Sequence, residues 1–356
     1  MFSPTTYLRW ARRFYGRVEL DLASSGMAAA PLSELGPLPA LDDLDSVEKL
    51  RDRIARYNRV AVGEALPTLG TTHALWTAYS ALLSPGDEVL VERPTYEPMY
   101  RIPEGLGARV TWFERPSEDG FALDPERVAA ALTPRTRLIA LSNLHNPSGA
   151  RASDEALCAV AELAERNGAH LLVDEVYAPF DATCDESGTW GGSARRLGGN
   201  VVVASSLTKV YGLGALRLGW LLGPSEVVAR GDDAVLSNLG HPPLSWSAMG
   251  VAAFDRLPAL AARARGLLDG KRARVEAWIA ARPRFTWSNP REGLFGFALD
   301  AQGKSLTATI ERAAAEAGVL VAAGEFFGVP NGFRLSWSID GSKLDEGLDR
   351  LARALE

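Results

Sequence analysis

The chain has 356 residues, which predicts about two domains and enough length to bury a sizeable core. Lys and Arg number 38 against 44 Asp and Glu, so the net charge is −6, which argues against a protein that binds nucleic acid through its phosphates. Hydrophobic residues make up 47% and charged residues 23% of the chain, which is typical of a folded globular protein and excludes a disordered or fibrous one.

Features that bear on location favour the cytoplasm. No segment approaches the ~18 consecutive apolar residues of a membrane helix, and residues 1–22 lack the apolar run of a signal peptide. Cys158 and Cys184 are the only cysteines, so we expect free thiols in a reducing compartment. The histidines lack metal-ligand spacing, so no metal site is expected. Neither a membrane nor a nucleic acid is an expected partner.

The order of apolar and polar segments predicts an N-terminal arm and a large α/β domain. Residues 1–40 form the expected arm, which should pack with the smaller domain, and Pro31, Pro37 and Pro39 make its end irregular. Over residues 41–244, short apolar runs alternate with helical patterns, and this alternation predicts a mostly parallel sheet covered by helices. The expected strands are Glu88–Glu92, Arg109–Phe113, Arg137–Ser142, His170–Asp174, Asn200–Ser205 and Arg217–Leu222. The clearest helix is Ser153–Asn167, with Ser153 as its N-cap.

Residues 245–356 have a different pattern. Helical spacing extends over residues 244–281, and two further strands are expected at Leu294–Leu299 and Gly332–Ser338, beside helices near 304–317 and 343–355. The sequence therefore predicts a linking helix followed by a smaller α+β domain.

Polar residues follow the predicted buried strands of the large domain. The strand at 137–142 leads into residues 143–149 (NLHNPSG), the one at 170–173 into residues 174–177 (DEVY), and the one at 200–204 into residues 205–209 (SSLTK). Because open α/β sheets bind ligands outside the carboxyl ends of their strands, these side chains are expected to converge.

The same motifs carry a family resemblance. Residues 146–149 (NPSG), Asp174 with Tyr177, Ser206 with Lys209, and Arg217 resemble fold-type I pyridoxal-phosphate enzymes, the class I/II aminotransferase family. Residues 70–72 (GTT), 94–96 (PTY) and 333–336 (FRLS) extend the resemblance over most of the chain. The resemblance implies the fold-type I PLP-transferase architecture, pyridoxal 5′-phosphate as cofactor, and a homodimer.

The resemblance implies three catalytic residues. Lys209 is expected to form the internal aldimine and then to move a proton between the substrate and the cofactor. Asp174 is expected to pair with the pyridinium N–H, since an unpaired carboxylate at a buried strand end would be costly. Tyr177, together with Asn146, is expected to hydrogen-bond the phenolic oxygen of the cofactor. The ordinary alternatives are a surface lysine, a helix cap or structural ion pair at Asp174, and a simple turn at Asn146.

The remaining cofactor and substrate contacts follow from the same resemblance. Thr71 and Thr72 open a helix whose free N–H groups favour a phosphate, although these residues alone could be a generic helix cap. Ser206 and Arg217 are expected to complete the phosphate site. The family positions also place Tyr96 on the pyridine ring, with core packing as the alternative, and Arg334 on the substrate carboxylate. Asn146 and Gly26 are the other expected substrate contacts.

These expectations leave the substrate open. The leading function is an aminotransferase that moves an amino group from an L-amino acid to a 2-oxo acid by a ping-pong mechanism. A lyase, cyclase or decarboxylase on the same fold is the alternative. Aromatic residues of the arm and Trp190 suggest an apolar or aromatic substrate pocket, although dimer packing is the preferred explanation for them. The arm residues are Tyr7, Trp10, Phe14 and Tyr15, with Met27. The family's cross-subunit phosphate tyrosine has no counterpart in residues 41–50 (LDDLDSVEKL).

Overall fold

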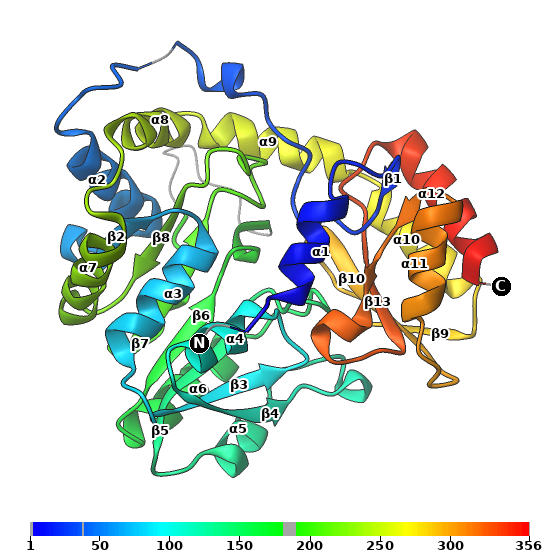
Figure 1. The fold of residues 1–356 in the computed structure, drawn as a ribbon, viewed down its shortest axis with the longest axis horizontal. Coiled ribbons are helices and arrows are strands. Elements are labelled where there is room, and N and C mark those ends of the chain that lie inside the picture. Colours follow the sequence, from blue (N-terminus) through cyan, green and yellow to red (C-terminus); the bar gives the residue numbers. More distant parts are fainter. Residues whose placement is uncertain (1–2, 38, 181–189, 356) are drawn as a thin grey trace.

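A seven-stranded sheet lies at the centre of the larger part of the molecule (Figure 1). The computed structural model describes residues 3–37, 39–180 and 190–355, and in it the strand order is β2-β8-β7-β6-β5-β3-β4. Strand β8 is antiparallel to both neighbours, and the other pairs are parallel. The bounds are β2 Ala65–Thr68, β3 Glu88–Arg93, β4 Arg109–Glu114, β5 Thr136–Ser142, β6 His170–Asp174, β7 Val201–Ser206 and β8 Gly219–Leu222. The expected mostly parallel sheet is confirmed.

Helices cover both faces of this sheet because its central strands are apolar on both sides. Along β7, Val201 and Val203 pack into one hydrophobic core, and Val202 packs into the core on the opposite face. The first core includes residues of α2 (Ser46–Asn58), α5 (Pro125–Ala131), α6 (Asp154–Arg166) and α8 (Leu244–Phe254). The second includes residues of α3 (Thr71–Leu82), α4 (Pro98–Gly105) and α7 (Ser225–Leu239).

The smaller part is built on an antiparallel sheet in the order β12-β13-β10-β9. Its strands are β9 Phe285–Trp287, β10 Phe295–Asp300, β12 Ala322–Ala323 and β13 Gly332–Ser336. Helices α10 (Lys271–Ala280), α11 (Thr307–Glu316) and α12 (Gly341–Leu355) contribute residues to its hydrophobic core. The helix α9 (Leu257–Leu268) runs between the two parts (Figure 1).

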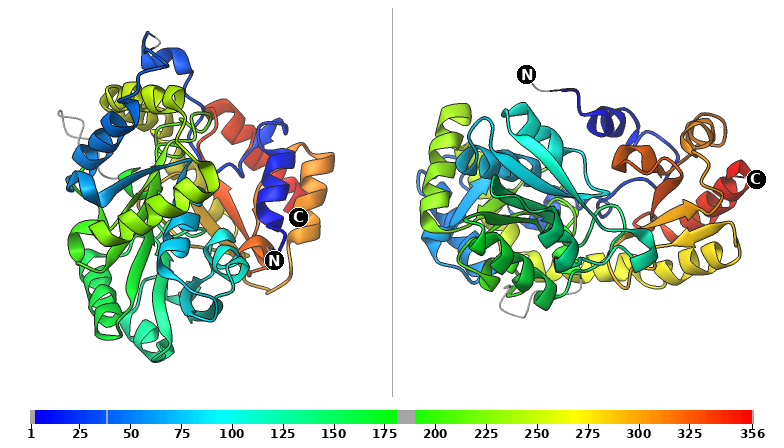
Figure 2. Two further views of the ribbon diagram at one scale, coloured as in Figure 1. Left: turned by 60° about the vertical axis from the view of Figure 1, so that its left-hand side comes forward. Right: turned by 90° about the horizontal axis from the view of Figure 1, so that it is seen from below.

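The N-terminal arm contacts both parts. Its strand β1 (Leu20–Asp21) pairs with β11 (Val319–Leu320) of the smaller part. The first turn of its helix α1 (Thr6–Phe14) contacts Glu97, whose carboxylate accepts hydrogen bonds from the Thr6 N–H at 3.0 Å and the Tyr7 N–H at 2.8 Å. Figures 1 and 2 show α1 between the larger and smaller parts.

The division of the chain at residues 40 and 245 stays a prediction. Residues of α8 and the first half of α9, up to Ala261, pack in the hydrophobic core on one face of the large sheet. The core of the smaller part includes Val275 of α10. None of the described helices is both long enough and apolar enough to cross a membrane.

Candidate active site

The carboxyl ends of three neighbouring strands meet at one edge of the large sheet. In the strand register Ser142 of β5 lies beside Asp174 of β6, and Asp174 lies beside Ala204 of β7. The segments that follow these strands therefore begin side by side, as the sequence predicted for polar residues after parallel strands.

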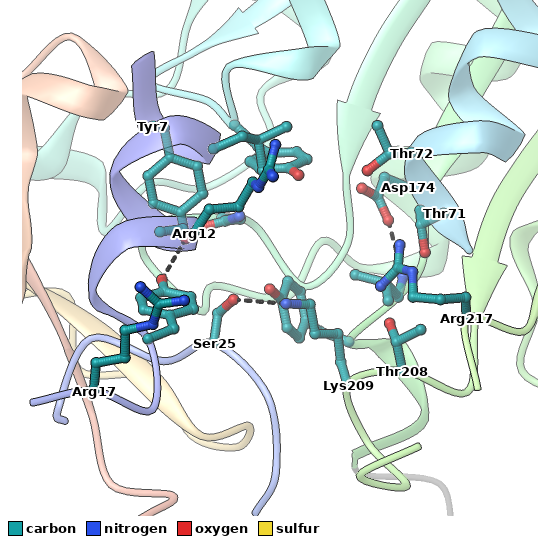
Figure 3. Close-up of a pocket in the computed structure, with 17 residues that line it drawn as sticks. Tyr7, Arg12, Arg17, Ser25, Thr71, Thr72, Asp174, Thr208, Lys209 and Arg217 are labelled. Atoms are coloured by element: carbon teal, nitrogen blue, oxygen red, sulfur yellow. Dashed lines mark hydrogen bonds between the residues drawn. The ribbon is translucent and has the colours of Figure 1, made fainter. Parts of the chain in front are cut away.

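A cavity of about 620 Å³ opens at this edge (Figure 3). Eight of the predicted site residues line it, namely Thr71, Thr72, Tyr96, Asn146, Asp174, Tyr177, Lys209 and Arg217. The arm forms the opposite wall through α1 and the turns that follow it. The cavity therefore lies between the large sheet and the N-terminal arm.

Lys209 follows β7 and lies near the middle of the cavity (Figure 3). Its Nζ donates a hydrogen bond to Ser25 Oγ at 3.0 Å, so the arm holds the amine in place. Burial lowers the pKa of Lys209 to about 8, and the positive charges of Arg334 and Arg217 act in the same direction. A larger share of this amine is neutral near neutral pH than for an ordinary lysine, and only the neutral amine can attack a carbonyl carbon.

Asp174 ends β6 and lies at the floor of the cavity. Its carboxylate accepts the Val176 N–H at 3.0 Å, and 4% of the residue surface is exposed. Burial raises the pKa of Asp174 to about 7, with a smaller contribution in the same direction from the nearby charge of Glu92. A cationic partner in the cavity would offset the cost of this buried carboxylate.

The loop after β5 is held by a buried polar network. The Asn146 N–H donates to Ser142 Oγ at 3.1 Å, and Ser142 Oγ donates to Glu92 at 2.5 Å. Arg115, fully buried, donates to the same carboxylate group at 2.7 Å. Asn146 is thereby fixed in the cavity wall, which it shares with Tyr177, whose pKa burial raises above its ordinary value.

The N-terminus of α3 provides a cradle for an anion. Gly70 precedes it with φ +83°, and a Cβ atom there would lie 2.6 Å from an Arg217 nitrogen, so a side chain would displace the guanidinium. Thr71 and Thr72 line the cavity in the first turn, where backbone N–H groups lack helical partners. Ser206 does not line the cavity; its hydroxyl accepts a hydrogen bond from Thr71 Oγ1 at 2.9 Å and contacts Thr208 Oγ1 at 2.7 Å.

Tyr96 lies between the cradle and the arm. Its ring makes an edge contact with Tyr7 of α1, with the centroids 5.8 Å apart. Burial raises the pKa of Tyr96, and the Thr72 side chain forms a hydrogen bond with it. The ring borders the cavity, so it is available to stack on a flat ligand.

Arg334 is fully buried in β13 behind the cavity wall. Its guanidinium donates to Asn146 Oδ1 at 2.7 Å and to Tyr7 Oη at 2.8 Å, while its Nε has no hydrogen-bond partner among the described residues. Gly26 lies against Lys209, because a Cβ atom there would lie 3.5 Å from Lys209 Cδ. Neither Arg334 nor Gly26 lines the cavity directly.

The aromatic pocket expected from the arm is only partly present. Tyr7 and Tyr15 line the cavity, but Trp10 packs against Phe326 of the smaller part with ring centroids 5.0 Å apart. The expectation for Trp190 was wrong, because its buried ring packs beside Tyr57 in the core of the large part. The other two, Phe14 and Met27, pack in hydrophobic clusters next to the cavity but do not line it.

Cys158, the cysteine that the structure describes, does not line this cavity. Cys158 is half-buried in α6 and forms no disulfide, and Cys184 lies outside the described residues. Within residues 3–37, 39–180 and 190–355, no three His, Cys, Asp or Glu side chains form a group that could hold a metal.

Comparison with known proteins assigns this arrangement to a family. Residues 24–351 match the family model described as aminotransferase class I and II. The chain belongs to this family. An arginine–pyruvate transaminase of Pseudomonas aeruginosa is 33% identical, with 87% of this chain and 81% of that protein aligned. The aminotransferase is also 31% identical to a capreomycidine synthase of Streptomyces vinaceus, over 97% of this chain and 92% of that one.

Solved structures support the fold. A PLP-dependent aminotransferase from Streptococcus suis superposes with a TM-score of 0.88 at 23% identity, covering 99% of this chain and 98% of that one. The protein is thus an aminotransferase of the pyridoxal-phosphate-dependent fold type I, and the fold class predicted from the sequence is confirmed.

The residues present fit pyridoxal phosphate. The cavity combines an amine of lowered pKa at Lys209, a buried carboxylate at Asp174 and an anion cradle at the start of α3. These groups match the aldehyde, the ring nitrogen and the phosphate of the cofactor.

Sequence reasoning missed several residues of the cavity wall. Ser25 and Thr208 are next to predicted site residues, but single hydroxyls in loops carry no pattern that marks them. Arg12 and Arg17 also line the cavity. They belong to an arginine-rich segment whose helical docking onto the site could not be seen in the sequence.

Proposed function

We propose that this aminotransferase moves the amino group of an L-amino acid to a 2-oxo acid by a ping-pong mechanism in the cavity centred on Lys209. The observation that carries the proposal is the position of the Lys209 amine in one cavity with Asp174 and the cradle at α3. Both half-reactions then use the same side chains.

Lys209 is proposed to move the proton. Bound pyridoxal phosphate supplies an electron-withdrawing ring that accepts the electron pair left when the substrate Cα–H bond breaks. The Lys209 Nζ takes that proton and later returns one, for which a pKa of about 8 suits an enzyme working near neutral pH. Ser25 Oγ orients the amine through the hydrogen bond at 3.0 Å.

The other side chains are proposed to hold the cofactor in place. Asp174 would bind the pyridinium N–H, and Tyr177 and Asn146 the phenolic oxygen. Tyr96 would stack on the ring. The phosphate would be held by Arg217 and the first turn of α3, which contains Thr71 and Thr72, with Ser206 fixing Thr71 from behind.

The substrate carboxylate is proposed to bind Arg334, which holds Asn146 on one side and whose Nε has no partner among the described residues. A guanidinium can donate two parallel hydrogen bonds to a carboxylate. Gly26, packed on Lys209, leaves space for the substrate beside the amine.

A cyclase, lyase or decarboxylase is the second candidate. The 31% identity with a protein named capreomycidine synthase, over 97% of this chain, favours keeping it. Residues that hold the cofactor do not by themselves decide which bond at Cα breaks.

A single-turnover experiment separates the two candidates. The holoenzyme is mixed with a pool of amino acids without any oxo acid, and the cofactor absorbance is followed. Transamination predicts that the band converts to that of pyridoxamine phosphate, with one oxo acid released per site. Recovery of the original band with ammonia, carbon dioxide or a cyclised product would reject it.

We also propose that the enzyme is a homodimer in the cytoplasm. Leu32, Leu41 and Leu44 are exposed in the last part of the arm and the residues just before α2, and a partner subunit would cover them. The presence of only two cysteines favours a reducing compartment. Light scattering of the holoenzyme is expected to give twice 38.2 kDa, and a fully active monomer would reject the dimer.

A further inference from the structure

Two arginines of the arm lie in the wall of the cavity. Arg12 comes from α1 and Arg17 from the turn after it, and both line the cavity. In Figure 3 they lie opposite Thr71, Thr72 and Arg217, with Lys209 between the two sides. The end of the cavity away from the anion cradle is therefore also cationic.

The guanidinium groups of Arg12 and Arg17 have no polar side-chain partner in the described part of the chain. Neither Arg12 nor Arg17 forms a side-chain hydrogen bond or ion pair with a residue in ranges 3–37, 39–180 and 190–355. By contrast, the neighbouring Arg13 lies over the Phe14 ring at 5.1 Å, and Arg9 does not line the cavity. The pair is therefore distinguished from the other arginines of the arm.

Among the described residues that line the cavity, positive charges outnumber negative ones, and Arg12 and Arg17, both exposed, contribute two of them. Lys209, Arg217, Arg12 and Arg17 line it, against the single carboxylate of Asp174 among the described lining residues. In the proposed function the cofactor phosphate binds Arg217, the pyridinium binds Asp174, and the substrate α-carboxylate binds Arg334. Arg12 and Arg17 remain, and arginine stays protonated at any pH the enzyme meets.

The surroundings of the pair suit a substrate side chain. Tyr7, Leu8 and Ala11 line the same wall and offer apolar contact to methylene groups. Beyond them, planar guanidinium groups match the geometry of a carboxylate or a phosphate.

We propose that the amino-acid substrate carries a second anionic group, a carboxylate or a phosphate, which Arg12 and Arg17 bind. This inference rests on the proposed function, because it assigns the substrate class of the same site. It also predicts that a cationic side chain is repelled, which would separate this enzyme from the relative named for arginine.

Binding of substrate analogues without an amino group tests the proposal independently of turnover. Dissociation constants of glutarate and of valerate are measured from their effect on the cofactor absorbance of the holoenzyme. Glutarate is expected to bind roughly tenfold more tightly, as two charge-assisted hydrogen bonds allow. The double variant Arg12→Gln/Arg17→Gln should lose that advantage, and Arg9→Gln on the same helix should keep it.

Steady-state rates identify the anion. The kcat/KM for L-glutamate is compared with that for L-glutamine, and the value for O-phospho-L-serine with that for L-serine. The larger of these two kcat/KM ratios identifies the natural anionic group as a carboxylate or a phosphate. The variant Arg12→Gln/Arg17→Gln should reduce that ratio about tenfold or more. Retention of the cofactor band in the variants shows that they fold.

The results also separate this proposal from the proposed function. Preference for neutral amino acids or for L-arginine, or a ratio unchanged in the double variant, would overturn the role of the arginines while transamination stands. Tight glutarate binding that depends on Arg12 and Arg17 supports this inference even where the single-turnover experiment detects a different reaction.

Discussion

At the residue scale, burial is the largest cause of the pKa shifts that suit Asp174 and Lys209 to their proposed roles. The same low-polarity surroundings raise the pKa of the carboxyl group to about 7 and lower that of the amine to about 8. The charged form of each group is less stable in this site than it is in water. In the protein without cofactor, burial of these two groups therefore costs free energy. A ligand whose groups pair with them would remove that cost.

This cost predicts a stabilising variant. The unfolded Asp174 ionises near its ordinary pKa of 3.8 and the folded one only near 7, so this residue lowers the stability of the folded state as the pH rises from about 4 to 7. Above pH 7 the loss reaches a few kcal/mol at most, because each tenfold change in an ionisation constant corresponds to about 1.4 kcal/mol. Asp174→Asn should therefore raise the Tm of the cofactor-free protein at pH 8 by several degrees and leave it nearly unchanged at pH 4.

The control is Asp233→Asn, an exposed residue of α7. Its Tm should match that of the unmodified chain at both pH values. An Asp174→Asn protein that melts lower than the unmodified chain at pH 8 would contradict the account of this carboxylate.

At the element scale, the arm helix α1 completes the cavity. Its first turn is held by Glu97 of the large part, which accepts from the Thr6 N–H, the Thr6 hydroxyl and the Tyr7 N–H. The Tyr7 hydroxyl then accepts from Arg334 of the smaller part at 2.8 Å. Helix α1 thus connects the two parts of the molecule beside the cavity.

Removing the acceptor should loosen the helix. Glu97→Ala leaves three donors without their partner, a loss comparable to that of an N-cap, or about 1 kcal/mol. Trypsin should cleave within residues 9–17 faster than in the unmodified holoenzyme, and the KM for the amino acid should rise while cofactor retention is unchanged. Glu104→Ala, in helix α4 that begins just after Glu97, has a side chain that is 38% exposed, and this variant should be cleaved at the normal rate. Equal cleavage of all three proteins would contradict the role of Glu97.

Several strands and helices could be predicted from the sequence. Runs such as 170–174 and 201–206 are apolar on both faces, so the central strands and the polar residues after them were predictable. Helix α6 begins as expected, with Ser153 Oγ accepting the Ala156 N–H at 3.2 Å. The strand β2 was missed, because residues 65–68 (ALPT) are short and contain a proline.

Contacts that depend on folding of distant segments could not be predicted. Ser25 meets Lys209 across 184 positions of the chain, and Arg334 meets Tyr7 across 327. No local pattern encodes such pairs. For the same reason the sequence could not show that Trp190 packs beside Tyr57 in the core, and it does not mark Arg12 and Arg17 as cavity residues.

At the scale of the whole molecule, the cavity lies between the large sheet and the N-terminal arm. Arg334 of β13, in the smaller part, lies behind the cavity wall and bonds to Tyr7 of the arm. The central claim is that the amine of Lys209 is the group that holds the cofactor. The chain has few competing amines, because its lysines are Lys49, Lys209, Lys271, Lys304 and Lys343.

Reduction of the holoenzyme with sodium borohydride fixes the cofactor to the amine that holds it, and peptide mapping by mass spectrometry then identifies that amine. The account predicts one modified peptide per chain, containing Lys209. Modification of Lys49, Lys271, Lys304 or Lys343 instead, or a Lys209→Ala protein that is labelled as fully as the unmodified one, would contradict it.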